Sequence, residues 1–367
     1  MKRFLGVLLL ALAVGCGRQD VLTLFVGTYS DGFYAYEFDQ VKGEVVSEGA
    51  FPEAPGAFAK APMPNPSYLT VAGTKVYAVS EMPDTSASVY AWRFRGKDFE
   101  LLNVRPTGLP ERGEDPCYVS TNGRLLAVAN YSGGTLGVYP LWKDGRIAPL
   151  DSLLISRTGG PDLSRQETPH VHCAVFSPDG KYLFFSEFSA DEIGMLDLVG
   201  EGVKNYRKAA SLPADFGPRH LLFDASGKHF YVIGELSGDI AVFDCSAGKL
   251  ELRQVVKADR VDARGAADIH FSPDGKFLYA SLRLRNDGIA VFSVAEDGTL
   301  TDAGYQRTGP HPRNFNLTPD GRWMLVACRD NNSVEIYGRN PDTGLLVDTG
   351  RRIQVEKPVF AGFAGND

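Results

Sequence analysis

The sequence predicts an all-β protein with the architecture of a seven-bladed β-propeller, whose blades are four-stranded antiparallel sheets. Beyond residue 20, short runs of β-branched and aromatic residues alternate with Gly, Asn, Asp and Pro, and no convincing amphipathic helix interrupts them. A unit made of a strand, a tight glycine turn and a second strand recurs, with turn glycines at positions 73, 123, 180, 227, 275 and 321. The spacings between these glycines, 50, 57, 47, 48 and 46 residues, match the length of a propeller blade.

Each unit is expected to contain four strands, which we name A, B, C and D in chain order. Strands A and B flank the glycine turn and are clearest in VFSPDGKYLFFSEF and HFSPDGKFLYASLRL, which begin at residues 175 and 270. A third strand follows, such as DIAVFD at 239–244 or GIAVFSV at 288–294, and a more polar fourth strand leads to the next unit. Six glycine turns therefore predict six complete blades.

The two ends of the chain are expected to form the seventh blade together. Residues 21–51 read as strands B, C and D without a strand A, whereas KPVFAGF at 357–363 reads as a strand A without followers. Joining them closes the ring and removes the exposed sheet edges that an open ring would leave. The sequence thus predicts one propeller domain over residues 21–367.

Residues 1–15 read as a signal peptide. Lys2 and Arg3 precede an apolar run over residues 4–14, which is shorter than the ~20 residues needed to span a bilayer. The small residues before Cys16 resemble a bacterial lipobox, so we expect cleavage before Cys16 and lipidation of that cysteine, with ordinary signal cleavage near this point as the alternative. Residues 16–20 form a short linker. We therefore expect an exported bacterial protein, either periplasmic or anchored to a membrane only through its N-terminal lipid.

Composition and motifs exclude several classes of function. A net charge of −7 with no basic run argues against nucleic acid as a partner. The chain has no GxSxG elbow, P-loop or HExxH motif, so it lacks the signatures of serine hydrolases, nucleotide-binding proteins and zincins. Cys117, Cys173, Cys245 and Cys328 lie far apart in strand-like segments and are expected to be free thiols. We expect a monomer without a cofactor.

Ionisable residues concentrate at one end of the predicted blades. Strand A runs toward the glycine turn and strand B runs back, so the start of A and the end of B lie on the same face of the disc. Five of the six histidines lie at or near a start of strand A: His170, His172, His220, His270 and His311. The ends of strand B carry Glu81, Asn130, Glu187, Glu235, Arg283 and Arg329. The turns on the opposite face are plain, so we expect the functional site on the first face.

Counting back from the turn glycines separates two sets among these residues. His172, Arg219 and Arg313 lie eight residues before their glycines, while His220, Asp268 and Asn314 lie seven before. Because side chains alternate along a strand, the two sets must point to opposite sides. We expect the first set to face the mouth of the central channel and the second set to point between blades, where Asp268 and His270 can form a structural pair.

The residue types at this mouth fit the addition of water to an ester-like carbonyl group. Arginines present paired donors for a carboxylate, a phosphate or an oxyanion. His172 can move a proton near neutral pH, and Glu235 can orient it or act as a base. His170 and His172 would share one face of a strand and could hold a metal ion with Glu187 or Glu235, but such a pair is a weak signal, and we expect acid–base use without a metal.

Several segments resemble the lactonase family of seven-bladed propellers, which includes the propeller-type 6-phosphogluconolactonase and the fungal carboxy-cis,cis-muconate cyclase. The segments that carry the resemblance are TPHVHCAVFSPDG (168–180), GPRHLLF (217–223), GELSGDIAVF (234–243), AADIHFSPDGKFLYASLR (266–283) and PRNFNLTPDG (312–321). The resemblance extends from residue 24 to the C-terminus. The chain departs from the family at DPCY (115–118), where HPCH is common, and at Gly234, where Asn is usual.

The resemblance implies that the protein opens or forms a lactone ring. It implies acid–base and anion-binding roles for His172, Arg219, Glu235 and Arg283, and we expect substrate contacts from Arg313, His170, His220, Asn130 and Glu187. The first hypothesis is hydrolysis of a sugar or sugar-acid lactone. The alternatives are a lactonising enzyme of the muconate type and a non-catalytic binding propeller. Export favours an unphosphorylated or carboxylate-bearing lactone, because 6-phosphogluconolactone is made in the cytoplasm.

Overall fold

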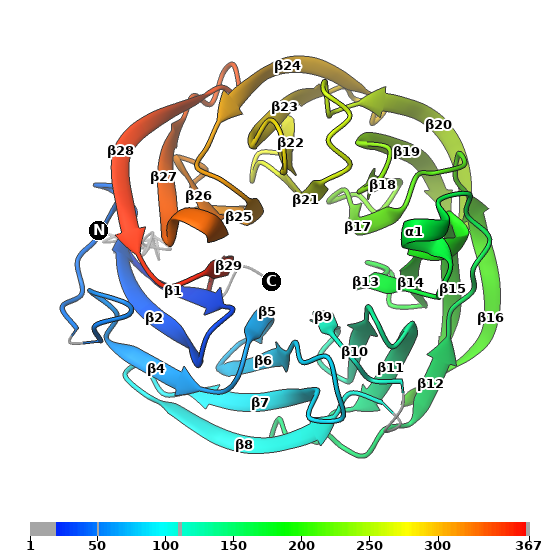
Figure 1. Cartoon of the computed structure of the whole chain (residues 1–367), viewed down its shortest axis with the longest axis horizontal. Helices are drawn as coiled ribbons and strands as arrows, with labels where there is room; N and C mark the ends of the chain where they lie inside the picture. The colour runs from blue at the N-terminus through cyan, green and yellow to red at the C-terminus, as the bar shows by residue number, and fades with distance from the viewer. Residues whose placement is uncertain (1–19, 50, 109–111, 365–367) are drawn as a thin grey trace, which may run out of the picture.

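The computed structural model describes residues 20–49, 51–108 and 112–364. Seven antiparallel sheets surround a common axis, with one strand of each sheet innermost, as Figure 1 shows. The predicted seven-bladed propeller is therefore confirmed. Helix in the described residues is limited to α1 (Leu163–Gln166) and to the 3-10 turns η1 (Phe188–Ala190) and η2 (Arg329–Asn331). The predicted signal peptide and Cys16 lie outside the described residues.

Six sheets each use four strands that are consecutive in the chain, in the predicted order A to D. The first three are β5 (Pro66–Ala72), β6 (Lys75–Ser80), β7 (Ser88–Phe94) and β8 (Phe99–Pro106); β9 (Pro116–Thr121), β10 (Leu125–Asn130), β11 (Thr135–Pro140) and β12 (Ser152–Ile155); and β13 (Val171–Phe176), β14 (Tyr182–Glu187), β15 (Glu192–Val199) and β16 (Gly202–Ser211). The next three are β17 (Pro218–Phe223), β18 (His229–Gly234), β19 (Asp239–Ser246) and β20 (Lys249–Lys257); β21 (Ala266–Phe271), β22 (Phe277–Leu282), β23 (Gly288–Val294) and β24 (Leu300–Arg307); and β25 (Pro312–Leu317), β26 (Trp323–Cys328), β27 (Ser333–Arg339) and β28 (Leu346–Gln354).

The seventh sheet joins the two ends of the chain, as predicted. The C-terminal strand β29 (Pro358–Phe363) pairs antiparallel with β1 (Val21–Thr28), from Leu24 opposite Phe363 to Thr28 opposite Pro358. The sheet continues through β2 (Gly32–Asp39) to β3 (Glu44–Val45) and β4 (Ala59–Pro62), both of which pair with β2. The prediction of one continuous strand D within 44–51 was wrong. Strand β3 ends at Val45, and β4 occupies the rest of the outer position; Pro52 and Pro55, which lack a backbone N–H, lie in the connection between the two short strands.

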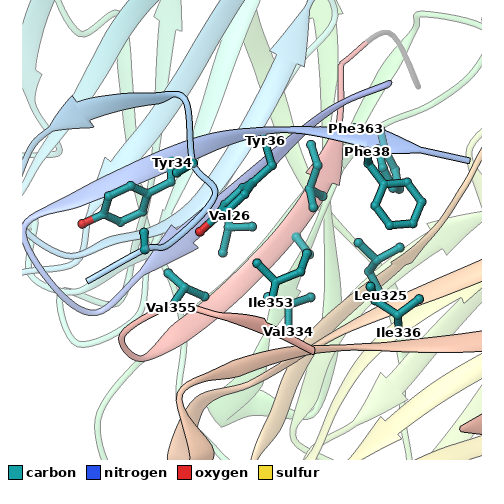
Figure 2. Close-up of a cluster of buried hydrophobic side chains, with 14 of the residues drawn as sticks. Val26, Tyr34, Tyr36, Phe38, Leu325, Val334, Ile336, Ile353, Val355 and Phe363 are labelled. Carbon is teal, nitrogen blue, oxygen red and sulfur yellow. The ribbon is translucent and has the colours of Figure 1, made fainter. Parts of the chain in front are cut away.

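The hydrophobic core lies between neighbouring blades. At the seam where the ring closes, Figure 2 shows aromatic side chains of β2, among them Tyr36 and Phe38, against Val334 and Ile336 of β27. All four side chains are at most 2% exposed. Burying such a side chain contributes about 1.5–3 kcal/mol, so the seam is held by apolar packing as well as by the pairing of β1 with β29.

The strand order fixes two different faces of the disc. On one face, each predicted turn glycine adopts a positive φ between 60° and 82°, at Gly73, Gly123, Gly180, Gly227, Gly275 and Gly321. A residue with a Cβ adopts this left-handed conformation at a cost, which explains why the turn recurs with glycine. The opposite face collects the starts of the A strands and the ends of the B strands.

Two further predictions concern the whole chain. The four cysteines of the described residues are free, with Cys117, Cys173 and Cys328 buried and Cys245 half-buried, which confirms the prediction of free thiols. Within the part of the chain that the structure describes, no helix has the length and hydropathy needed to cross a bilayer.

Candidate active site

Two sets of equivalent positions meet around the axis on the face opposite the glycine turns. The second residue of each A strand gives Ser67, Cys117, His172, Arg219, Ala267, Arg313 and Val359. The residue that follows each B strand gives Tyr29, Glu81, Tyr131, Phe188, Glu235, Arg283 and Arg329. A pocket of about 160 Å³ lies here, lined by Glu81, Cys117, Tyr131, Arg165, His172, Glu235, Arg283 and Arg313. All of its lining residues except Arg165 belong to these two sets.

The carboxylate of Glu235 binds three arginines. Arg219 donates from Nε to Oε2 at 2.9 Å, and Nη2 of Arg283 lies 3.2 Å from the same oxygen. Arg165 donates from Nη2 to Oε1 at 2.8 Å. Burial alone would raise the pKa of Glu235, but the charges of Arg283, Arg219 and Arg165 outweigh it and lower the pKa to about 2. Glu235 is therefore an anion at neutral pH and, in this resting arrangement, a weak base.

A second ion pair lies across the pocket. Nη2 of Arg313 is 3.3 Å from Oε2 of Glu81, and the hydroxyl group of Tyr29 donates to the other oxygen of Glu81 at 2.7 Å. The guanidinium group of Arg313 also lies over the ring of Tyr29, 5.3 Å from its centre. Four guanidinium groups thus face two carboxylates at this mouth, which leaves a surplus of positive charge.

His172 lies beside these charged groups with one ring nitrogen unused. The side chain is 4% exposed, and its Nδ1 has no hydrogen-bond partner among the described residues. Its ring contacts the rings of Tyr131 and His220, with centres 5.6 Å and 5.4 Å apart. Burial, followed by the charge of Arg219, holds the pKa of His172 well below its ordinary value, so the imidazole is neutral at pH 7 and keeps a lone pair.

The second predicted set of strand-start residues forms a separate polar cluster. His220 Nδ1 lies 2.6 Å from one oxygen of Asp268, while His270 Nε2 at 3.0 Å and Asn314 Nδ2 at 2.5 Å approach the other oxygen. The structure therefore does not place His220 in the pocket, where we expected a substrate contact. His220 follows Arg219 directly on β17, where the register with β18 shifts between Pro218 and Leu221, and its ring is directed toward Asp268.

Asn130 and Glu187 were also expected at the substrate and lie elsewhere. Asn130 is buried and donates to the backbone oxygen of Thr107 at 2.6 Å. Glu187 is buried and accepts a hydrogen bond from Tyr206 at 3.1 Å. Both are the last residues of their B strands, and the position that reaches the mouth is the next one, which is Tyr131 after Asn130.

His170 supports the pocket wall from behind. Its ring stacks on the ring of Tyr131 with centres 4.2 Å apart, and its Nδ1 lies 2.8 Å from the backbone oxygen of Tyr131. It is not among the residues that line the pocket, so His170 and His172 do not form a shared ligand pair there. In the described ranges, no group of three or more His, Cys, Asp or Glu side chains is arranged to hold a metal ion.

Three lining residues, Cys117, Tyr131 and Arg165, were missed by sequence reasoning. Tyr131 directly follows its B strand, as Glu81, Glu235 and Arg283 follow theirs. Assigning the same length to every B strand would therefore have found it. Arg165 lies on α1, in the connection formed by residues 156–170. This connection of 15 residues is the longest between a D strand and the next A strand, the next being residues 107–115 with nine. The glycine spacing of 57 residues, the largest of the five, is its signal in the sequence.

Comparisons with known proteins match this description. Residues 23–363 match the family described as "Lactonase, 7-bladed beta-propeller". A 6-phosphogluconolactonase of Formosa agariphila is 31% identical over 342 residues, which cover 88% of this chain and 94% of that protein. The crystal structure of a "putative 6-phosphogluconolactonase" from Bacteroides uniformis is 48% identical, with a TM-score of 0.88 and coverage of 94% of this chain and 100% of that chain. The periplasmic gluconolactonase of Pseudomonas aeruginosa is 29% identical, with a TM-score of 0.84 and coverage of 95% and 100%.

Proposed function

The chain belongs to the lactonase family of seven-bladed β-propellers, and from this premise we propose that it hydrolyses the lactone ring of a sugar or sugar acid at the mouth pocket. The observation that supports this proposal most directly is the pairing of two features. His172 is a neutral imidazole with an unused nitrogen, and it lies beside a surplus of guanidinium groups. A proton acceptor and a stabiliser of negative charge are what the addition of water to an ester carbonyl requires.

The reaction then assigns a role to each group. A water molecule donates a proton to His172 as its oxygen bonds to the carbonyl carbon of the lactone. The carbonyl oxygen becomes negative and is stabilised by the guanidinium group of Arg283, which faces the pocket. The ring C–O bond breaks, and the proton returns from His172 to the leaving ring oxygen. Arg219, fully buried behind Glu235, keeps that carboxylate in place.

The experiment measures lactone opening by the proton that the product acid releases. Purified protein lacking residues 1–16 is expected to open glucono-1,5-lactone, its 6-phosphate or glucaro-1,4-lactone faster than buffer alone. Arg219→Ala is expected to lower the rate by at least tenfold, because it removes a donor from Glu235. Arg253→Ala serves as a matched control, because Arg253 is exposed on β20 and pairs with Asp244.

Two results would contradict the proposal. One is a rate on all three lactones that does not exceed the spontaneous rate. The other is formation of a lactone from a muconate by the same protein without any hydrolysis of sugar lactones, which would indicate a lactonising enzyme. Equal rates for wild type and Arg219→Ala would contradict the assignment of the pocket.

We also propose that the protein is exported and anchored by a lipid on Cys16. The support is the apolar run over residues 4–14, followed by small residues and a cysteine, together with the similarity to a gluconolactonase named as periplasmic. Incorporation of labelled palmitate into the wild type, and its loss in Cys16→Ala, is the expected result. Equal labelling of both proteins would contradict it. We propose that the folded protein acts as a monomer, which sedimentation would check.

A further inference from the structure

We propose that Arg165 is a specificity-determining residue that binds an anionic substituent of the lactone, a carboxylate or a phosphate, at the side of the pocket away from the carbonyl carbon. The inference rests on the proposed function and names the substrate class of the same site. In the resting protein Arg165 pairs with Glu235, and the substrate anion takes its place as the partner.

Arg165 differs from the other three arginines of the mouth in its exposure. Its side chain is 35% exposed, against 1% for Arg219, 6% for Arg283 and 14% for Arg313. The three buried arginines also have partners fixed by the propeller itself. Arg219 donates to the backbone oxygen of Ala267 at 2.6 Å, and Arg283 donates to that of Gly265 at 2.9 Å. Among these four groups, Arg165 is therefore the one that an incoming ligand reaches first.

The hydrogen bonds that the guanidinium group of Arg165 makes in the resting protein can be exchanged for bonds to a ligand anion. Both of its hydrogen bonds with described residues come from one nitrogen, Nη2, which donates to Glu235 at 2.8 Å and to the hydroxyl group of Tyr131 at 3.2 Å. Glu235 keeps two arginines on its other oxygen when Arg165 turns away. The guanidinium group of this ion pair is partly exposed, and a bidentate bond to a carboxylate or phosphate can replace the pair.

The segment that carries Arg165 is fixed, so the exchange involves the side chain alone. Arg264 bridges Asp162, which caps α1, and Asp215 of the next connection, with N to O distances of 2.6 Å to each. The side chain of Gln166 is 1% exposed and donates to the backbone oxygen of Phe188 at 3.0 Å. These anchors hold α1 over the mouth and give the guanidinium group of Arg165 a defined position.

The charge of the mouth favours an anionic ligand. Three guanidinium groups and two carboxylates line the pocket, a fourth guanidinium group, that of Arg219, lies buried behind Glu235, and His172 is neutral, so a ligand with one or two negative charges improves the balance. When Arg165 leaves Glu235, one of the three charges that lower the pKa of Glu235 is removed, so its pKa rises.

The test compares neutral and anionic lactones in Arg165→Gln, with Arg165→Lys as the conservative variant. We expect KM for 6-phosphoglucono-1,5-lactone, for glucaro-1,4-lactone or for both to rise by about tenfold to a hundredfold, as expected for the loss of a charge-assisted hydrogen bond. The value of kcat/KM for neutral glucono-1,5-lactone should change by less than about threefold, because that lactone has no charge-assisted bond to lose. Arg165→Lys should recover part of the loss. An effect on only one anionic lactone identifies the substituent as phosphate or as carboxylate.

Arg157→Gln is the matched control. Arg157 lies in the same connection, is 46% exposed and pairs with Glu187 and Glu192 outside the pocket. It should leave the kinetics with all three lactones unchanged, and thermal unfolding of each variant confirms that the fold is intact.

Two kinetic results would overturn the inference. One is an equal loss on neutral and anionic lactones, which would mean that Arg165 only holds Glu235. The other is no change with any lactone. If wild type hydrolyses none of the lactones, the proposed function fails, and calorimetric titration with inorganic phosphate and with glucarate then tests Arg165 separately. At least tenfold weaker binding of one anion to Arg165→Gln supports the inference, and equal binding of both overturns it.

Discussion

Two buried carboxylates lie along the axis of this propeller, and their surroundings differ. Glu235 borders the mouth pocket and binds three guanidinium groups, one of them partly exposed. Asp268 is 1% exposed and binds His270 of its own strand, His220 of β17 and Asn314 of β25. The first site has more cationic charge than its carboxylate neutralises, whereas in the second the carboxylate itself is buried and only His270 is partly exposed.

The difference shows how one repeated strand can serve two purposes. Arg219 and His220 are adjacent on β17, yet one points to Glu235 and the other to Asp268. The second residue of β17 is directed to Glu235 at the pocket, and the third residue is directed to the contacts between blades. The cluster around Asp268 joins β17, β21 and β25 and is expected to stabilise the ring, while the cluster around Glu235 is expected to carry the reaction.

Removing the charge of Asp268 gives the largest expected effect on stability. Asp268→Asn leaves His220 and His270 without their common anion, and loss of one partner of a buried pair costs about 3–5 kcal/mol. The free energy of unfolding in urea is the measurement. Asp244→Asn is the control, since its side chain is 41% exposed and its pair with Arg253 is worth at most about 1 kcal/mol. A change as small as in the control would mean that the cluster around Asp268 does not hold the ring.

Replacement of His172 tests the other half of the comparison. His172→Gln is expected to lower kcat/KM for lactone hydrolysis by about 10²–10⁴, because the proton acceptor is lost. Its free energy of unfolding should fall by less than that of Asp268→Asn, since Nδ1 of His172 has no partner to lose among the described residues. His229→Gln, on the turn face, should keep full activity. Retention of activity by His172→Gln would assign the proton transfer to another group.

The pH dependence of the reaction is the smallest of the three effects and sharpens the comparison. Burial and the charges of Arg219, His220, Arg313 and Arg283 hold the pKa of His172 well below its ordinary value, and the pKa of Glu235 is lowered to about 2. Activity that needs neutral His172 is lost as pH falls through that lowered pKa. We therefore expect kcat/KM to change by less than about threefold between pH 7.5 and pH 5.5, whereas an ordinary histidine would give about a tenfold loss.

A strong dependence on pH would contradict a lowered pKa of His172. A tenfold decrease over this range in the wild type would mean that His172 titrates as an exposed histidine. The spontaneous rate of lactone opening, subtracted at each pH, serves as the control.

Most of the fold was predictable because one physical signal repeats. A glycine with positive φ at every A–B turn gave the blade count, and the unmatched strands at the two ends gave the closure. Strand D of the closing sheet was not predictable in this way, because the two short strands β3 and β4 share the outer edge, with Pro52 and Pro55 between them. Local composition predicts strands well only where a continuous ladder exists.

The site was predictable in part for the same reason. Counting from the glycine selected His172 and Arg313, which line the pocket, and Arg219, which is buried behind Glu235. In the sheet of β9 to β12 the turn between the first two strands is shorter, so Cys117 lies six residues before Gly123 and escaped the count. At the B strands, an error of one residue selected Asn130 and Glu187 instead of the residues that follow them. Arg165 could not be found by counting, because it lies in a connection outside the repeat. The ion pairs of Arg264 with Asp162 and Asp215, which are distant in sequence, set the position of that connection.

The join between β1 and β29 has a consequence for biosynthesis. Tyr29, which follows β1, donates to Glu81, and the β29 strand that completes its sheet is synthesised after every other strand of the described residues. An emerging chain can build its middle sheets early, yet it cannot finish the mouth until translation has reached residue 363. Copies that end before β29 are thus expected to leave the inner edge of β1 unpaired.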